Sequence, residues 1–287
     1  MPNYTVETEE AGLPLEQFLA RRIPAAPEGY LRQLIRKGKV LCAAKPREAG
    51  HLVSAGEKIH LPDSARLREL IEGPTDSTRP VEILFESREI LIVNKPAGLA
   101  VHSSKGHEQD NLTDRLRVRY DKFSIAPVQR LDLETSGPII FGKGKKSCAA
   151  LGKLFLQGEV KKYYLALVSG KVQGRGLLST EIPAKGKLKT AETGYAVLGG
   201  NEHATLLELE LHTGRQHQIR RQLADIDHPL FGDRRYRGPC PPQLPRLFLH
   251  CRRLIFDDPF SRQRIDVSAP LPNELVTFLQ PLGLKIG

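Results

Sequence analysis

The sequence predicts an α+β protein in which a large domain, with a largely antiparallel mixed sheet flanked by helices and loops, follows a small N-terminal α/β domain. Patterns typical of strands and helices occur mixed along the chain rather than in regular alternation, which argues against a parallel α/β sheet. The length of 287 residues exceeds that of most single domains. A polar tract rich in turn formers, residues 63–80, separates the two parts. We therefore expect domains at residues 1–62 and 81–287, joined by this linker.

The composition is that of a globular protein of the cytoplasm. Hydrophobic residues make up 40% of the chain and charged residues 26%. No apolar run approaches the roughly 20 residues that a membrane-spanning helix needs. The opening MPNYTVETEE is acidic and polar, unlike a secretory signal or a transit peptide. We expect a cytoplasmic protein with no membrane partner.

Cysteine usage fits a reducing compartment. The four cysteines form no CxxC pair and are too sparse for a disulfide framework. They are Cys42, Cys148, Cys240 and Cys251. The last two, considered with His228 and His250, match no zinc spacing. We expect buried or incidental thiols, no metal and no cofactor.

Residues 13–62 predict two short helices followed by short strands. Apolar stripes within residues 15–19 and 31–35 define the helices, and Gly38 ends the second. A net charge of +10 suggests an acidic partner such as nucleic acid. A solvated basic surface would give the same total, so the position of the charges carries more weight.

One basic cluster lies on the second helix and just after it, with no acid between its members. It consists of Arg32, Arg36, Lys37 and Lys39. A basic helix end followed by glycine and a strand can hold phosphates. A solvated helix face is the alternative, and charge alone favours that alternative.

The second domain begins with two short strands, 81–86 and 90–94, and a Pro-Gly turn. Asp110 or Asn111 can cap a helix that extends to Tyr120. Further strands are expected at 138–141, 160–170, 177–182, 192–198, 204–211, 246–256 and 263–267. Further helices are expected from Ser147 to Gln157, from Arg215 to Ala224 and after Pro272.

One acid lies in a tight basic turn. The segment RLDLETSG places Asp132 two residues after Arg130 and just before turn-forming residues. An arginine close to a carboxylate favours the ionised form, which can serve as nucleophile or base. The alternative is that Asp132 forms a structural pair with an arginine or caps the turn. Without further context, the segment favours this structural role over a catalytic one.

A second cluster, LELHTGRQHQIRRQLAD, predicts a strand, a Thr-Gly turn and a helix. With a helix from Arg215, three-residue spacing puts Arg215, Gln218 and Arg221 on one face and a four-residue step puts Gln216 and Arg220 on another. A helix start of this kind can hold phosphates.

Two histidines of this cluster, His212 on the strand and His217 in the helix, raise a phosphodiesterase as an alternative. No partner carboxylates lie at metal-ligand spacing, so this alternative is weak. A third segment, VKKYYLALVSG, contains two tyrosines in a predicted strand. Tyrosines in strands more often pack against neighbouring strands than act as catalytic residues. Alternation puts Tyr163 and Tyr164 on opposite faces, so only one can face a given site.

Four motifs taken together, NKPAG, RLDxxTSG, KKYYLALVSG and TGRQHQIR, occur in the order and approximate spacing of the RluA-type pseudouridine synthases. The resemblance spans residues 81–282 and includes HPLFGD at 228–233 and FLHCRRLIF. The small domain resembles the RNA-binding domain shared by a ribosomal small-subunit protein, tyrosyl-tRNA synthetases and many pseudouridine synthases. LIRKGKV and AGEKI carry that second resemblance.

The resemblance implies that uracil in RNA is detached from its ribose, turned and rejoined through carbon, without cofactor or metal. The invariant aspartate of the family falls on Asp132, which would attack the anomeric carbon or assist elimination to a glycal. Tyr164 matches the active-site tyrosine, as a base in the glycal route and a ring that stacks on uracil. Arg220 matches the arginine that pairs with the catalytic carboxylate, and Arg130 a residue that fills the space of the flipped-out base.

Other substrate contacts are expected from basic and polar residues in both domains. In the large domain they are Arg215, His217 and Gln218, with phosphates held by the KGKK, KK and KGKLK segments. In the small domain they are Arg32, Arg36, Lys37 and Lys39.

The sequence departs from the family pattern at a few positions. Gln129 replaces histidine and Pro138 a leucine, and Arg221-Gln222 stands where Val-His is common. In the small domain, Glu28-Gly29 replaces Ser-Arg, and CAAK replaces VNGK. The changes in the large domain bear on which RNA is used more than on the chemistry, whereas those in the small domain bear on its affinity for RNA and not on its fold.

The resemblance therefore implies a monomeric RNA pseudouridine synthase with large-subunit ribosomal RNA as its expected substrate. Transfer RNA is an alternative substrate. A non-catalytic RNA-binding or ribosome-assembly factor that kept the fold is a further alternative, and retention of Asp132, Tyr164 and Arg220 argues against it.

Overall fold

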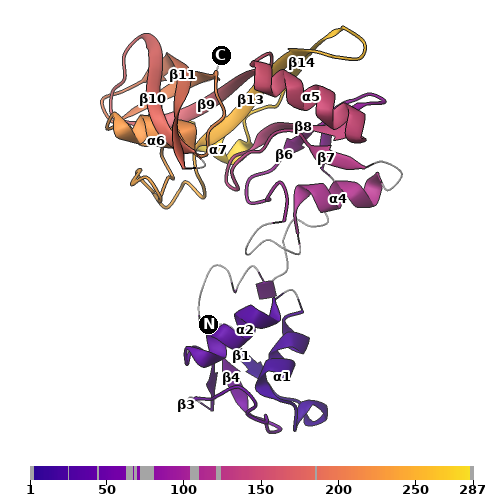
Figure 1. Cartoon of the computed structure of the whole chain (residues 1–287). Helices are drawn as coiled ribbons and strands as arrows, with labels where there is room; N and C mark the ends of the chain where they lie inside the picture. The colour runs from indigo at the N-terminus through magenta and orange to yellow at the C-terminus, as the bar shows by residue number, and fades with distance from the viewer. Residues whose placement is uncertain are drawn as a thin grey trace. The chain divides into compact units, whose positions relative to one another are not determined.

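The computed structural model divides into two compact units, Met1–Pro80 and Val81–Gly287 (Figure 1). It describes residues 3–24, 26–43, 45–62, 67, 70–71, 81–103, 110–120, 124–184 and 186–284. Most of the tract expected as a linker, 63–80, lies outside the described residues, as does Lys185 of the KGKLK segment. Within the described ranges, no helix has the length and apolar character needed to span a bilayer.

The first unit packs two helices, α1 (Leu15–Arg22) and α2 (Glu28–Arg36), with four short antiparallel strands. The sheet order is β1 (Asn3–Thr5), β4 (Lys58–His60), β2 (Leu41–Cys42) and β3 (Lys45–Pro46). A 3-10 turn, η1 (Thr8–Glu10), precedes α1. The predicted apolar stripes of both helices are buried in one core, and Gly38 follows α2 with a φ of 63°.

The second unit begins with a four-stranded antiparallel sheet in the order β5 (Glu82–Glu86), β6 (Ile90–Lys95), β8 (Gly137–Lys143) and β7 (Ile125–Pro127). Helices α4 (Leu112–Arg119) and α5 (Lys145–Gln157) cover this sheet (Figure 1). Alternate residues of β6 belong to two cores, Leu91 and Val93 with α4, Ile90 and Ile92 with α5. The period of two thus buries both faces of the strand.

The larger sheet has six antiparallel strands in the order β10, β11, β12, β9, β13 and β14. They are β9 (Lys161–Ser169), β10 (Arg175–Ala184), β11 (Lys187–Gly200), β12 (Ala204–Leu211), β13 (Leu249–Asp257) and β14 (Arg264–Ser268). Helix α6 (Gln218–Asp225) lies next to β10, and α7 (Asn273–Leu279) and η2 (Gln280–Leu282) close the chain. The predicted α+β fold with a largely antiparallel sheet is confirmed.

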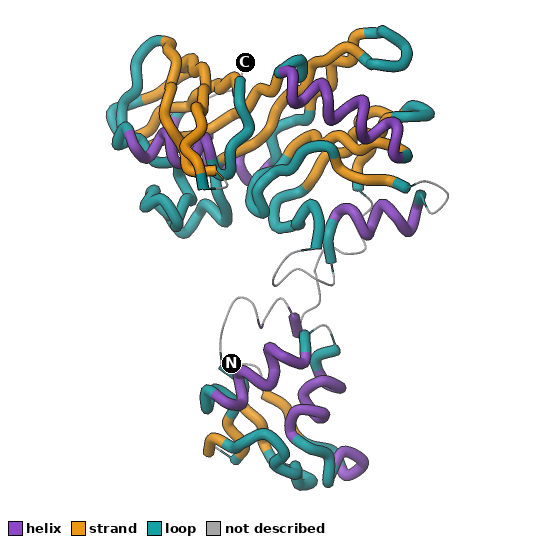
Figure 2. The backbone as a smooth tube through the Cα atoms, in the orientation of Figure 1, coloured by secondary structure: helices purple, strands orange, loops and turns teal. Residues whose placement is uncertain are grey.

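The two sheets meet where β8 begins beside β13, and Figure 2 shows their strands side by side in orange. The amide of Cys251 donates to the carbonyl of Ser136 at 2.8 Å. Gly137 follows with a φ of 120°, and a Cβ there would lie 2.0 Å from the Cys251 carbonyl oxygen. Only glycine fits this approach. The RLDLETSG segment is thereby fixed against the larger sheet.

Three expected boundaries are wrong by three residues or more. The strand expected at 192–198 begins at Lys187. The helix expected from Arg215 begins at Gln218, and His217 precedes it with a φ of 53°. Arg215 therefore lies outside the helix and does not share a helical face with Gln218 and Arg221, nor does Gln216 with Arg220. The strand expected from Arg246 begins at Leu249.

The physical reason for the late start of α6 is a turn held by the side chain of Gln218. Its carbonyl oxygen accepts from the Thr213 hydroxyl at 2.7 Å and from the Arg215 amide at 3.0 Å. These bonds satisfy polar groups in a turn that would otherwise extend the helix.

Candidate active site

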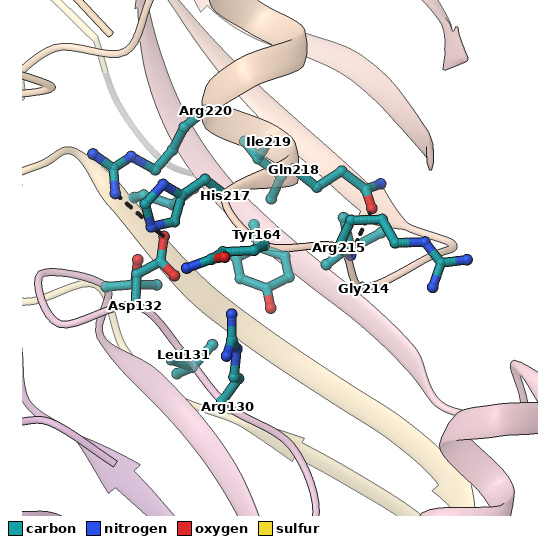
Figure 3. A pocket seen from close by; sticks show the side chains of 14 residues that line it. Arg130, Leu131, Asp132, Tyr164, Gly214, Arg215, His217, Gln218, Ile219 and Arg220 are labelled. Carbon is teal, nitrogen blue, oxygen red and sulfur yellow. Dashed lines mark hydrogen bonds and ion pairs between the residues drawn. The ribbon is translucent and has the colours of Figure 1, made fainter. Parts of the chain in front are cut away.

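A pocket opens where the RLDLETSG segment, strand β9 and the turn before α6 converge (Figure 3). The three residues expected to be catalytic, Asp132, Tyr164 and Arg220, all line it. So do the expected contact residues Arg130, Arg215, His217 and Gln218. Segments more than 80 residues apart in sequence therefore form one site, since Asp132 and Arg220 are 88 positions apart.

Asp132 lies in the turn before β8, with its carbonyl accepting from the amide of Thr135 at 3.1 Å. Its Oδ2 lies 3.3 Å from Nη1 of Arg220 and 3.8 Å from Nε2 of His217. The side chain is 23% exposed. The carboxylate is thus oriented from one side by a cation and remains accessible from the pocket.

Arg220 is held by a second and more tightly bound carboxylate. Asp233 is completely buried and accepts from Nε and Nη2 of Arg220 at 2.7 and 2.8 Å. Burial opposes the charge of Arg220, but hydrogen bonds and attraction from Asp233 and Asp132 raise its pKa above the ordinary value. Arg220 is therefore a permanent cation with a fixed direction.

The ring of Tyr236 completes the shell around this cation. Its centroid lies 5.2 Å from the guanidinium carbon of Arg220, in cation–π geometry. The same ring meets His217 edge-on, with centroids 5.9 Å apart and an interplanar angle of 89°.

The Tyr236 hydroxyl contacts both His217 and Arg221. The hydroxyl accepts from Nε of Arg221 at 3.0 Å and lies 3.1 Å from Nδ1 of His217. A hydroxyl that accepts from an arginine keeps its own proton to donate, and donation to Nδ1 would leave the proton of the neutral imidazole on Nε2, the nitrogen that lies 3.8 Å from Oδ2 of Asp132.

The pKa of His217 is lowered below 6.5, chiefly because the ring is desolvated. Asp132 acts in the opposite direction, and the positive charges of Arg220, Arg235 and Arg221 add to the lowering. His217 is therefore a neutral donor at neutral pH.

Tyr164 and Tyr163 point to opposite faces of β9, as strand alternation predicts. Tyr164 lines the pocket, while the Tyr163 hydroxyl reaches Glu210 at 3.4 Å on the other face. Burial raises the pKa of Tyr164 well above 10, with further contributions from Cys251 and Asp132. Tyr164 is consequently a neutral phenol whose ring forms one wall of the pocket.

The other residues expected to contact the substrate have different hydrogen-bond partners within the protein. Gln218 is buried and also donates to the carbonyl of Glu192 at 3.0 Å, so it supports the turn. Arg215 donates to the carbonyl of Thr190 at 3.3 Å. Arg130 is exposed at the pocket and forms no ion pair with Asp132 in the described part of the chain. The partner of the acid is Arg220.

Positions that depart from the family pattern have structural partners. Gln222 is completely buried and donates to the Ala191 carbonyl at 2.8 Å, which ties α6 to the sheet. The Gln129 amide donates to the carbonyl of Pro138 at 3.4 Å, at the entry to β8. Neither Gln222 nor Pro138 lines the pocket.

The segment behind Asp132 is held by a buried lysine that the sequence reasoning missed. Nζ of Lys95 donates to the carbonyls of Pro96, Leu99 and Leu133 at 2.8, 2.8 and 3.1 Å. Its pKa is lowered to about 7, chiefly by burial and also by repulsion from Arg246, while attraction to Asp132 opposes the shift. Its place in the NKPAG motif was the available signal.

Arg246 and His250 hold the same segment from the other side. Arg246 donates to the Glu134 carbonyl at 3.2 Å and to the Ser136 hydroxyl at 3.0 Å, and it pairs with Glu274. His250 lies 2.9 Å from the Ser136 hydroxyl through Nδ1 and 3.2 Å from the Ala269 carbonyl through Nε2. His250 lies within FLHCRRLIF and Asp233 within HPLFGD, but neither had an assigned role, and no sequence pattern marked Arg246.

The basic cluster belongs to the first unit, whereas the pocket residues belong to the second. Arg32, Arg36, Lys37 and Lys39 are all exposed, and Arg32 pairs with Glu28 at 3.4 Å. Arg32 and Arg36 line a groove with residues 46–49.

Potential metal ligands lie close together in the first unit. In the described ranges, the single cluster of possible ligands is Cys42, His51 and Glu57. His228 is instead bonded to the Ser169 carbonyl at 2.7 Å, and Cys240 is exposed.

A family model of RNA pseudouridylate synthases matches residues 89–225. The chain is 32% identical over 307 residues to "Ribosomal large subunit pseudouridine synthase D" of Nitrosomonas europaea, covering 97% of this chain and 87% of the relative. It is 29% identical over 304 residues to "Ribosomal large subunit pseudouridine synthase C" of Vibrio parahaemolyticus, covering 98% and 95%. An "Uncharacterized RNA pseudouridine synthase" of Aquifex aeolicus is 33% identical over 278 residues, with 88% and 86% covered.

Solved structures share the fold. "Human RNA Pseudouridylate Synthase Domain Containing 4" superposes with a TM-score of 0.60 at 24% identity, over 71% of this chain and 94% of that structure. "Human RNA Pseudouridylate Synthase Domain Containing 1" gives a TM-score of 0.56 at 23% identity, over 74% and 98%.

Proposed function

The chain belongs to the RluA-type RNA pseudouridine synthases, and from that premise we propose that it isomerises uridine in large-subunit ribosomal RNA with Asp132 as the reactive carboxylate. The observation that carries the assignment of Asp132 is its position in the pocket, 3.3 Å from a guanidinium that a buried acid holds in place. The ribosomal substrate is supported by relatives named as ribosomal large subunit synthases that align over nearly the whole chain.

The reaction exchanges one bond at C1′ of the ribose for another. The bond from C1′ to N1 of uracil breaks, the base turns within the pocket, and C1′ forms a bond to C5. C5 then loses its proton and N1 gains one, so the product is an isomer of the substrate. Asp132 supports either route, by adding to C1′ or by assisting loss of the C2′ proton. In both routes the carboxylate must face the sugar, and Arg220 orients it for that purpose.

Neutral groups around the carboxylate suit a detached uracil. Tyr164 offers an aromatic face for stacking and a phenol hydroxyl that donates hydrogen bonds. His217 offers an Nε2–H beside Asp132, positioned to donate to an oxygen of the sugar or base. The cation Arg220 balances the charge of Asp132, so the pocket does not repel an RNA phosphate nearby.

Binding of the target requires its nucleotide to leave the base stack. Arg130 is exposed beside the pocket and is placed to fill the vacated position by stacking. The basic residues of the first unit, Arg32, Arg36, Lys37 and Lys39, supply additional phosphate contacts.

The experiment is to map pseudouridines in RNA from a strain that lacks the protein, complemented with the wild-type chain or with Asp132→Asn. We expect specific sites in large-subunit ribosomal RNA to disappear and to return only with the wild-type chain. Loss of sites from transfer RNA alone would overturn the assigned substrate. Restoration by Asp132→Asn would overturn the role of the acid.

A further inference from the structure

The segment Asp233–Gly238, DRRYRG, forms a closed loop beside the pocket. Backbone bonds join its ends, from the Gly238 amide to the Asp233 carbonyl at 2.8 Å and from the Gly232 amide to the Pro239 carbonyl at 2.7 Å. A Cβ at Gly238 would lie 1.8 Å from the Leu230 carbonyl oxygen, so only glycine fits there. This loop, called here the arginine loop, has a fixed shape before any ligand binds.

The inner side of the arginine loop contacts the site already described. Asp233 binds Arg220, and one of its oxygens also accepts from the amides of Arg235 and Tyr236 at 3.1 Å each. Tyr236 contacts His217 and Arg220 through its ring and hydroxyl. Asp233 and Tyr236 therefore hold both the backbone of the loop and the pocket residues Arg220 and His217.

The outer side of the arginine loop carries Arg234, Arg235 and Arg237, all exposed. Throughout the described residues, none of the three forms an ion pair with a carboxylate. Arg237 adopts a φ of 59°, which side chains other than glycine rarely take, so the loop holds it in an uncommon conformation. The charge of Arg235 also reaches the pocket, since it helps to lower the pKa of His217.

We propose that the arginine loop binds the backbone phosphates of RNA next to the nucleotide in the pocket. Three guanidinium groups without acidic partners match phosphate oxygens in charge and in paired N–H geometry. The fixed loop lowers the entropy lost on binding. Because its inner side holds Arg220 and His217, RNA that sits on the loop is placed at the catalytic carboxylate. The proposal rests on RNA as the substrate.

The test uses the full-length Asp132→Asn protein, so that binding is measured without turnover. Its affinity for a uridine-containing single-stranded oligoribonucleotide is measured against KCl concentration. We expect the triple variant Arg234→Ala, Arg235→Ala, Arg237→Ala to bind at least about tenfold more weakly and to lower the salt slope by about 2, since each phosphate contact on a single strand contributes about 0.7.

A matched control removes three exposed positive charges to which no RNA contact is assigned, with Lys153→Ala, Arg262→Ala and Arg264→Ala. We expect this control to keep the slope, and a triple lysine variant of the arginine loop to restore most of it. An unchanged slope in the alanine variant, or an equal fall in the control, would overturn the proposal. Because this assay needs no isomerisation, it can fail while the pseudouridine mapping succeeds, and the reverse also holds.

Discussion

Asp233 is completely buried and binds Arg220 through both of its carboxylate oxygens, at 2.7 and 2.8 Å. The contact of Arg220 with Asp132 is longer, at 3.3 Å. Asp233 therefore binds the guanidinium more tightly than Asp132 does. The buried acid fixes its direction, and the pocket acid keeps enough freedom to meet a substrate.

Replacing Asp233 with asparagine should lower both stability and activity. The change puts a neutral group in the buried position and leaves Asp132, at 3.3 Å, as the carboxylate partner of Arg220. Breaking a buried pair in this way costs about 3 kcal/mol. Denaturant unfolding measures the loss, and turnover on RNA should fall further than the folded fraction accounts for. The control is Asp266→Asn, which breaks a largely exposed pair with Arg253 and should cost about 0.5 kcal/mol or less. Equal costs for the two variants would contradict the arrangement.

Replacing Asp132 with asparagine should abolish isomerisation and leave RNA affinity intact. Removal of a reactive carboxylate typically lowers turnover by about 10⁴-fold or more. Pseudouridine formation and equilibrium binding are measured on the same RNA. Glu134→Gln is the matched control, because it removes the same charge two residues away on an exposed side chain. Residual turnover above a hundredth of the wild-type rate would refute the role of Asp132.

Local patterns predicted most helices and strands correctly, because these elements depend on nearby residues. Apolar spacing and Asn111 marked α4, whose cap accepts from the Asp114 amide at 3.0 Å. Gly158, at a φ of 75°, marked the end of α5. The start of α6 was missed because the side chain of Gln218 holds a turn there, and apolar periodicity carries no information about such bonds.

The site was less accessible to sequence reasoning because its partners are far apart in the chain. Proximity suggested Arg130 as the partner of Asp132, and only the family resemblance indicated Arg220. Lys95 and Asp233 lie in the NKPAG and HPLFGD motifs, but no local pattern indicated what they bind, and Arg246 was marked by no pattern at all. Their roles arise from buried contacts between segments that only folding brings together.

Stability should fall as the pH is lowered, and His250 should account for part of the fall. Burial, chiefly, lowers its pKa from 6.5 to about 4. Between these values the unfolded chain binds more protons than the folded protein, so stability is present above pH 6.5 and is lost toward pH 4. The full contribution is about 3 kcal/mol. Unfolding curves of His250→Gln should show a correspondingly smaller pH dependence, whereas His203→Gln, at an exposed position, should match the wild type.

Removing the hydroxyl of Tyr236 should allow the proton of His217 to occupy either ring nitrogen, while the Tyr236 ring stays packed against the imidazole. In Tyr236→Phe the edge-on contact and the contact with Arg220 remain, but the hydrogen bonds to Nδ1 and from Arg221 are lost. A donor to Nδ1 favours the neutral imidazole, so its loss should raise the pKa of His217 and populate both tautomers. Nitrogen-15 NMR of labelled histidines measures both effects, and kcat should fall about tenfold at unchanged KM, as expected for about 1.4 kcal/mol. Tyr163→Phe, on the opposite face of β9, should change neither spectrum nor rate. A proton found on Nδ1 of His217 in the unaltered protein would contradict the assignment, whatever the effect on turnover.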